Sequence, residues 1–76
     1  MDKSQWAENL LKDEYFQAMM EELRSVEINK FAMSEFGDAA VRENAYQQLR
    51  SFEKIESYLE SLSAQKLIDE KRLKIL

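Results

Sequence analysis

The stretch Ser34-Glu35-Phe36-Gly37-Asp38 decides the fold, because it interrupts an otherwise continuous helical sequence. Gly37 is the only glycine among the 76 residues, and the chain contains no proline. Glycine can adopt the left-handed backbone geometry that ends many helices, and Asp38 is a good N-cap for a following helix. We therefore expect one helix to end in this stretch and another to begin directly after it.

Nothing in the sequence stops a helix on either side of this break. At the start of the chain, Asp2 with Gln5 three residues later resembles a capping box, and Ser4 is a competing N-cap. The first helix is predicted over about residues 3–34 and the second over about residues 38–63.

The connection between these helices is short, which makes them antiparallel neighbours. The expected fold is therefore all-α, an antiparallel two-helix hairpin that forms a single domain over residues 1–76. The last residues, 64–76, are expected to form a short C-terminal helical tail. This tail either continues the second helix or bends near Ser63 and folds back.

Apolar residues recur at helical spacing on both predicted helices. On the second helix they form one stripe, with Leu49 beside it: Val41, Ala45, Phe52, Ile55, Leu59 and Leu62. On the first helix, the stripe expected to pack on the second helix is Leu11, Tyr15, Phe16, Met19, Leu23, Val26 and Met33. Each helix is thus expected to bury one face.

The first predicted helix also carries a second apolar set, which is roughly 100–150° around its axis from the first stripe. Its members are Trp6, Leu10, Ile28 and Phe31, with Met20 bridging toward the first stripe. One neighbouring helix covers only about one stripe, so these five residues are the candidate partner interface. A second copy of the chain or a larger protein is expected to cover them, although the tail folded over Trp6 is an alternative.

Charge and composition restrict the function classes. The net charge is −4, and residues 65–76 hold four basic and two acidic side chains, a net +2 that leaves −6 elsewhere. A nucleic-acid binder normally presents a basic face, so direct binding to DNA or RNA is not expected. No apolar run approaches the roughly 18 residues of a membrane span, and the first ten residues lack signal-peptide features. A soluble intracellular protein is expected.

The residue inventory also argues against catalysis. Histidine and cysteine are both absent, which excludes the common nucleophile–base pairs and the usual zinc ligands. The carboxylates that neighbour one another on the helices are interpreted as solvated surface. No enzyme activity, cofactor or metal site is therefore expected.

Short motifs along the chain resemble a group of small α-helical proteins that tailed bacteriophages encode near their head and DNA-packaging genes. The motifs are Ala7-x-x-Leu10-Leu11-x-Asp13, Phe16-Gln17, Phe31 with Ser34 and Asp38, Arg42-Glu43-x-Ala45-Tyr46, and Leu59-Glu60-Ser61. The chain departs from the group at Phe31, where members tend to have Trp, at Ser34, where they have Thr, and at Gln65-Lys66, where they have Gly-Lys. The resemblance implies a phage setting, with the protein in the host cell cytoplasm or in the virion, and it assigns no functional residue.

The leading hypothesis is a non-enzymatic protein–protein interaction module, a phage accessory protein acting in virion head assembly or DNA packaging. Its expected partners are other copies of itself, or a larger phage or host protein. The rival hypothesis is a small acidic inhibitor of a host or defence protein that mimics DNA by presenting carboxylates in place of phosphates. Direct nucleic-acid binding through the basic tail is a minor alternative.

Overall fold

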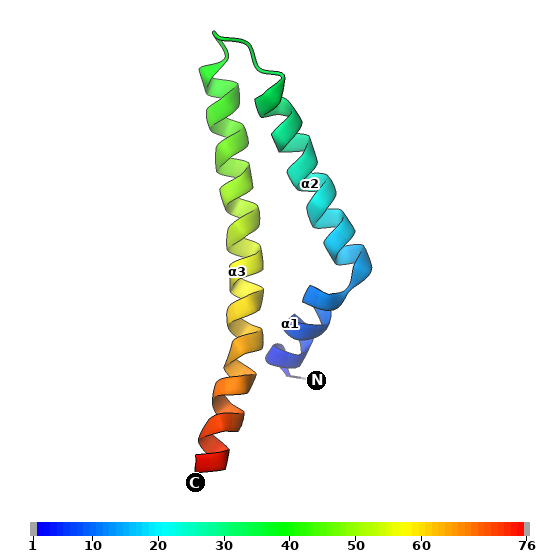
Figure 1. The fold of residues 1–76 in the computed structure, drawn as a ribbon, viewed down its shortest axis with the longest axis vertical. Helices are drawn as coiled ribbons and strands as arrows, with labels where there is room; N and C mark the ends of the chain where they lie inside the picture. The colour runs from blue at the N-terminus through cyan, green and yellow to red at the C-terminus, as the bar shows by residue number, and fades with distance from the viewer. Residues whose placement is uncertain (1, 76) are drawn as a thin grey trace.

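A computed structural model describes the backbone of residues 2–75 and the side chains of residues 2–65. This part of the chain is helical, without any β-strand, which confirms the predicted all-α class. The helices are α1 (Lys3–Lys12), α2 (Glu14–Ala32) and α3 (Ala39–Ile75). Figure 1 shows α3 running the length of the molecule, with α2 descending from the loop and diverging from α3 before α1 turns back toward it. Both α1 and α2 contact α3.

The predicted first helix over residues 3–34 is wrong, because the chain breaks at Asp13 into two helices. Asp13 has an extended backbone (φ −70°, ψ 126°) and ends α1 with a hydrogen bond from its N–H to the carbonyl of Leu10. Its carboxylate accepts a hydrogen bond from the N–H of Phe16 at 2.8 Å, which caps the start of α2. In addition, the Gln17 amide donates to the carbonyl of Leu11 at 2.8 Å. These bonds satisfy backbone groups that a helix break leaves unpaired.

The N-terminus of α1 agrees with the sequence. Asp2 is the N-cap, and its carboxylate accepts a hydrogen bond from the N–H of Gln5 at 2.7 Å. The same residue type at Asp13 caps α2, followed by Glu14 in the first turn, where the helix dipole favours a negative charge. An Asp-Glu pair also occurs on helix surfaces, so in a stretch without proline or glycine it did not indicate the break.

The loop between α2 and α3 lies where the sequence predicted it, but Gly37 does not have the predicted geometry. The C-cap of α2 is Met33, in a right-handed conformation (φ −91°, ψ 0°). Gly37 itself has no positive φ, in common with every other described residue. A β-carbon placed on Gly37 would meet nothing within 4 Å. The turn therefore does not depend on glycine.

The loop is stabilised by Arg42, which lies one turn into α3, and not by a residue with a left-handed backbone. Its guanidinium donates hydrogen bonds to the Ser34 hydroxyl at 3.2 Å, to the Glu35 carbonyl at 2.6 Å and to the Phe36 carbonyl at 3.3 Å. The Asp38 carboxylate accepts a further bond from the N–H of Glu35 at 2.9 Å. Side chains at the start of α3 thus provide hydrogen-bond partners for the backbone N–H and carbonyl groups of the loop.

The second predicted helix, over residues 38–63, is too short. Helix α3 continues without a bend at Ser63 and ends at Ile75, so the tail extends this helix and does not fold back. The side chains of residues 66–76, including the apolar and basic ones of the tail, lie outside the described residues. The predicted cover of Trp6 by the tail involves these side chains and lies outside the described residues.

The core of the molecule is thin. Its buried residues within the described side chains are Ala7, Met20, Glu27, Ala45 and Leu59. The radius of gyration is 17.3 Å, whereas a compact domain of this length has about 11 Å. The molecule measures 60 × 23 × 14 Å, so most side chains lie close to solvent.

The stripe predicted to pack against the second helix is largely wrong for α2. Tyr15 and Met33 are 86% and 82% exposed, and Met19, Leu23 and Val26 are exposed as well. Met20 and Glu27 are the buried residues of α2. The face of α2 that is buried is therefore not its most apolar face, because Glu27 is covered while Leu23 and Val26 are exposed.

The stripe predicted on the second helix agrees better with α3. Ala45 and Leu59 are buried, and Leu49, Phe52 and Leu62 are half-buried. The other two members, Val41 and Ile55, are exposed at the edge of the contact face.

We expect Asp13→Ala to lower the free energy of unfolding by about 1 kcal/mol, because it removes the N-cap acceptor of α2. Urea denaturation followed by circular dichroism measures this change. Asp13→Asn keeps an oxygen acceptor and should retain most of the stability. Equal or higher stability of the alanine variant would show that the cap does not hold the break.

We expect Gly37→Ala to raise the free energy of unfolding by about 0.5 kcal/mol, since alanine restricts the unfolded chain and meets open space in the fold. Thermal and urea unfolding of the two proteins provide the comparison. Gly37→Asn is the diagnostic control, because asparagine tolerates a left-handed backbone better than alanine does. A loss of stability in the alanine variant, absent from the asparagine variant, would contradict the geometry described for this residue.

Candidate functional site

Exposed apolar side chains are the dominant surface feature of the described residues. Four apolar residues are buried, against thirteen large apolar residues that are exposed. Single exposed apolar residues are normal on proteins, but contiguous patches mark contact surfaces. The arrangement of these thirteen side chains therefore decides where a contact surface lies.

The structure separates the five residues of the predicted partner interface. Met20 is only 2% exposed, so it belongs to the core and not to a surface. Trp6 is exposed and Leu10 half-buried, both on α1. Ile28 and Phe31, near the end of α2, are 52% and 48% exposed and share one pocket.

This pocket lies between the C-terminal part of α2 and the N-terminal part of α3. Its volume is about 300 Å³, and it is lined by Ile28, Phe31, Ala32, Tyr46 and Leu49. The volume is at the lower end of the range for ligand sites and suits an apolar side chain better than a cofactor. The sequence placed Tyr46 and Leu49 on the second helix, but it had no signal that aligned them with Ile28 and Phe31.

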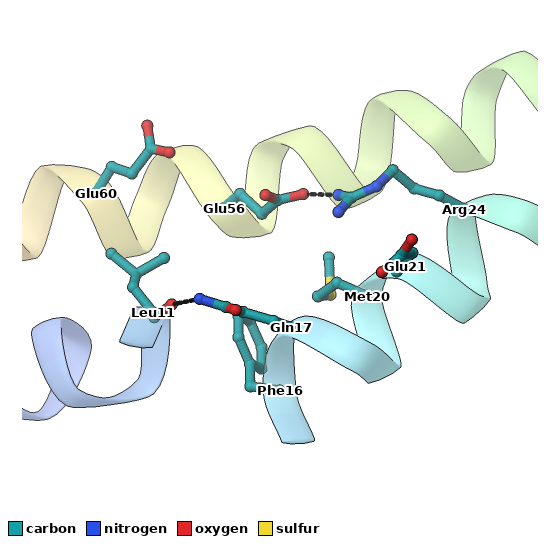
Figure 2. Close-up of a pocket in the computed structure, with 8 residues that line it drawn as sticks. All are labelled: Leu11, Phe16, Gln17, Met20, Glu21, Arg24, Glu56 and Glu60. Atoms are coloured by element: carbon teal, nitrogen blue, oxygen red, sulfur yellow. Dashed lines mark hydrogen bonds and ion pairs between the residues drawn. The ribbon is translucent and has the colours of Figure 1, made fainter. Parts of the chain in front are cut away.

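A larger and more polar pocket of about 640 Å³ lies where α2 diverges from α3 (Figure 2). It is lined by Leu11, Phe16, Gln17, Met20, Glu21, Arg24, Glu56 and Glu60. The Arg24 guanidinium donates to the Glu56 carboxylate and bridges the two helices across the pocket, as Figure 2 shows. The long side chains of Arg24 and Glu56 reach across the space between α2 and α3, which shorter apolar side chains would not fill.

The chemistry of this pocket is limited to carboxylates, an amide and one guanidinium. Within the part of the chain that the structure describes, no group of three or more acidic side chains is arranged to bind a metal ion. A guanidinium stays protonated at neutral pH and cannot serve as a general base. The pocket therefore offers polar contacts between the helices.

Glu27 places a carboxylate in the contact between α2 and the rest of the molecule. It is 8% exposed, and its Oε1 lies 3.4 Å from the Nζ of Lys30. Its Oε2 has no hydrogen-bond partner among the described residues. Glu27 therefore brings a polar group to a covered position that an apolar side chain usually occupies.

No protein-family model, no curated protein and no solved structure matches this chain. None of the described helices combines the length and the apolar character that crossing a membrane requires. The functional interpretation therefore depends on the surfaces described above.

We expect a double-mutant cycle of Arg24→Met and Glu56→Gln to give a coupling energy of about 1 kcal/mol, because the pair joins two helices and is two-thirds buried. The control cycle uses Arg50 and Glu53, an exposed pair three residues apart on α3 with N···O 2.8 Å. That coupling should be about 0.3 kcal/mol. Urea denaturation of the variants measures both values, and equal couplings would show that the bridge does not fix α2 to α3.

Proposed function

We propose that this chain is a non-enzymatic protein–protein interaction module. The observation that carries the proposal is the imbalance between four buried apolar residues and thirteen large exposed ones in the described chain. A chain of this size without disulfide bonds gains stability by covering such surface with another protein. The residue inventory, without histidine or cysteine, supports a binding role over a catalytic one.

The setting that we propose is a tailed bacteriophage, with the chain acting in virion head assembly or DNA packaging. This part rests on the motifs that resemble small helical phage proteins, among them Arg42-Glu43-x-Ala45-Tyr46. Assembly proteins act by contact with other subunits, which agrees with the exposed apolar surface. The host cell cytoplasm or the virion is then the place where the chain acts.

The arrangement of charges favours this function over acidic inhibition by DNA mimicry. Several carboxylates have basic partners: Glu8 lies 2.9 Å from Lys12, Glu53 lies 2.8 Å from Arg50, and Glu56 pairs with Arg24. A DNA mimic needs a row of uncompensated negative charges. Paired carboxylates present a weaker negative field to a DNA-binding protein.

The test is an affinity purification of the tagged full chain from phage-infected cells, with bound proteins identified by mass spectrometry. Portal, capsid or terminase components are the expected partners, and their binding should persist at high salt because apolar contacts are not screened. Recovery of a host nuclease, polymerase or defence complex through salt-sensitive binding would contradict the assembly role and favour the inhibitor.

Two phenylalanines provide a matched comparison in the same purification. Phe31→Glu places a charge in the apolar pocket, and we expect at least about tenfold lower recovery of the partner. Phe36→Glu adds the same charge to a loop residue that is fully exposed, and it should leave recovery unchanged. Loss of recovery with Phe36→Glu alone would show that the loop makes the contact instead of the pocket.

A further inference from the structure

The corner between α1 and α2 consists of one residue, Asp13. Its φ of −70° is already close to that of an α-helix, and its ψ of 126° is what departs from the helical value of about −42°. Rotation about a single backbone bond therefore separates this corner from a continuous helix over residues 3–32. Neither proline nor glycine occurs in this range, so each of its residues can occupy a helix interior.

The hydrogen bonds at the corner replace bonds that a continuous helix would make. In such a helix, each N–H near the corner would bond to the carbonyl four residues earlier. At the corner, the N–H of Asp13 bonds to Leu10 instead, and the N–H of Phe16 bonds to the Asp13 carboxylate. The Gln17 amide bonds to the Leu11 carbonyl. Because hydrogen bonds are exchanged for one another, the local free-energy difference between the two forms is small.

The corner is exposed to solvent on one side and borders a pocket on the other. Residues 12–15 are all exposed. Leu11, Phe16 and Gln17, which lie on either side of the break, line the pocket of about 640 Å³ in Figure 2. A change of ψ at Asp13 therefore does not have to displace a closely packed core.

Packing of α1 on α3 is what favours the bent form within one chain. Figure 1 shows α1 beside the yellow part of α3, and α1 contacts α3 more extensively than it contacts α2. Ala7 is completely buried, Leu10 and Leu11 are half-buried, and Leu59 is buried on α3. In a straight helix, α1 would leave α3, and the apolar side chains of this contact would be uncovered.

The part of α3 that α1 leaves selects its occupant through the contact already seen in the monomer. That contact is made by a helix with a small buried residue, Ala7, and two leucines after it. Close packing discriminates against side chains of another size, and the α1 of a second copy presents the same ones. In a two-fold dimer, each α1 covers α3 of the other chain, so both contacts form again.

We propose that Asp13 is a hinge at which α1 and α2 join into one helix, and that the released α1 packs on α3 of a second copy. The product is a dimer with exchanged α1 helices. Such an exchange needs no new interface, because the contacts of the dimer are those of the monomer. This inference goes beyond the proposed function and does not depend on it, since the hinge acts whichever protein the apolar pocket binds.

The first test is the dimer dissociation constant of the full chain, from sedimentation velocity and light scattering. The wild type should be a monomer of 9.0 kDa at about 1 µM and largely a dimer at about 1 mM. Asp13→Ala removes a cap that the bent form alone uses, and alanine favours a helix interior. Two corners straighten in each dimer, so a cap worth about fivefold per corner predicts about 30-fold tighter dimerisation.

Two further substitutions provide the controls. Glu14→Pro locks the corner, because proline suits the first helical position and restricts the preceding residue to the extended backbone that Asp13 has. This variant should stay monomeric up to about 1 mM and keep the helix content of the wild type in circular dichroism. Asp2→Ala removes a cap of the same kind from the start of α1, which both forms use equally, so it should leave the dissociation constant unchanged.

A distance within one chain separates exchange from ordinary association, and it requires no substitution at the corner. The chain has no cysteine, so Lys3→Cys and Ser25→Cys place one spin label on α1 and one on α2. A straight helix separates these positions by about 33 Å along its axis, whereas the corner brings them closer together. With an excess of unlabelled chain, the dimer should show the longer distance and the monomer the shorter one.

Three results would each overturn the inference: a wild type that is monomeric at about 1 mM, a dimer that keeps the shorter distance, or dimerisation of Glu14→Pro equal to that of the wild type. The proposed function is tested separately, by partner recovery with Phe31→Glu, which leaves the corner intact. Recovery of a phage assembly protein by monomeric Glu14→Pro would support that function without the exchange. An exchanged dimer that recovers only a host or defence protein would support the inference and overturn the assembly role.

Discussion

Helix α3 contacts α1 along one part of its length and α2 along another, so the molecule consists of paired helices without an enclosed interior. This constraint determines most of its properties. Each helix can cover only the side of its neighbour that faces it, so the buried set is small and rich in alanine. Ala7 and Ala45 allow close approach of the helices but contribute little buried apolar area. The larger apolar side chains, such as Ile55 and Phe31, are left at the edges of the contact.

The break at Asp13, where α1 meets α2 at a corner, increases the buried area in spite of this constraint. If the helix continued straight through Asp13, residues 3–12 would lie still farther from α3 than the start of α2 does. The capped break turns α1 back onto α3, where Ala7 and Leu59 become buried. The same corner leaves the polar pocket of Figure 2, which Arg24 and Glu56 bridge with long side chains.

Residue types and spacing predicted the all-α class, the loop near residues 34–38 and most of the inner face of α3, and Asp2 was one of the two N-cap candidates. They failed at Asp13, because an aspartate that caps a helix is locally no different from one on a helix surface. They also chose the wrong side of α2, since the most apolar stripe was assumed to face inward. The structure buries Glu27 and exposes Val26, which only tertiary packing decides. Of the candidate site, Ile28 and Phe31 were predicted as neighbours, whereas Tyr46 and Leu49 required the pairing of the helices.

Helix α2 is attached in different ways at its ends and in its middle. Arg42 binds the loop that follows α2, and Asp13 with Gln17 joins α2 to the end of α1. The buried residues of α2, Met20 and Glu27, and the ion pair of Arg24 with Glu56 all lie in its middle part. The contact of α2 with α3 is therefore concentrated within two turns of Arg24. A substitution there affects the position of the whole helix, whereas a substitution at either end changes the connection to the neighbouring segment.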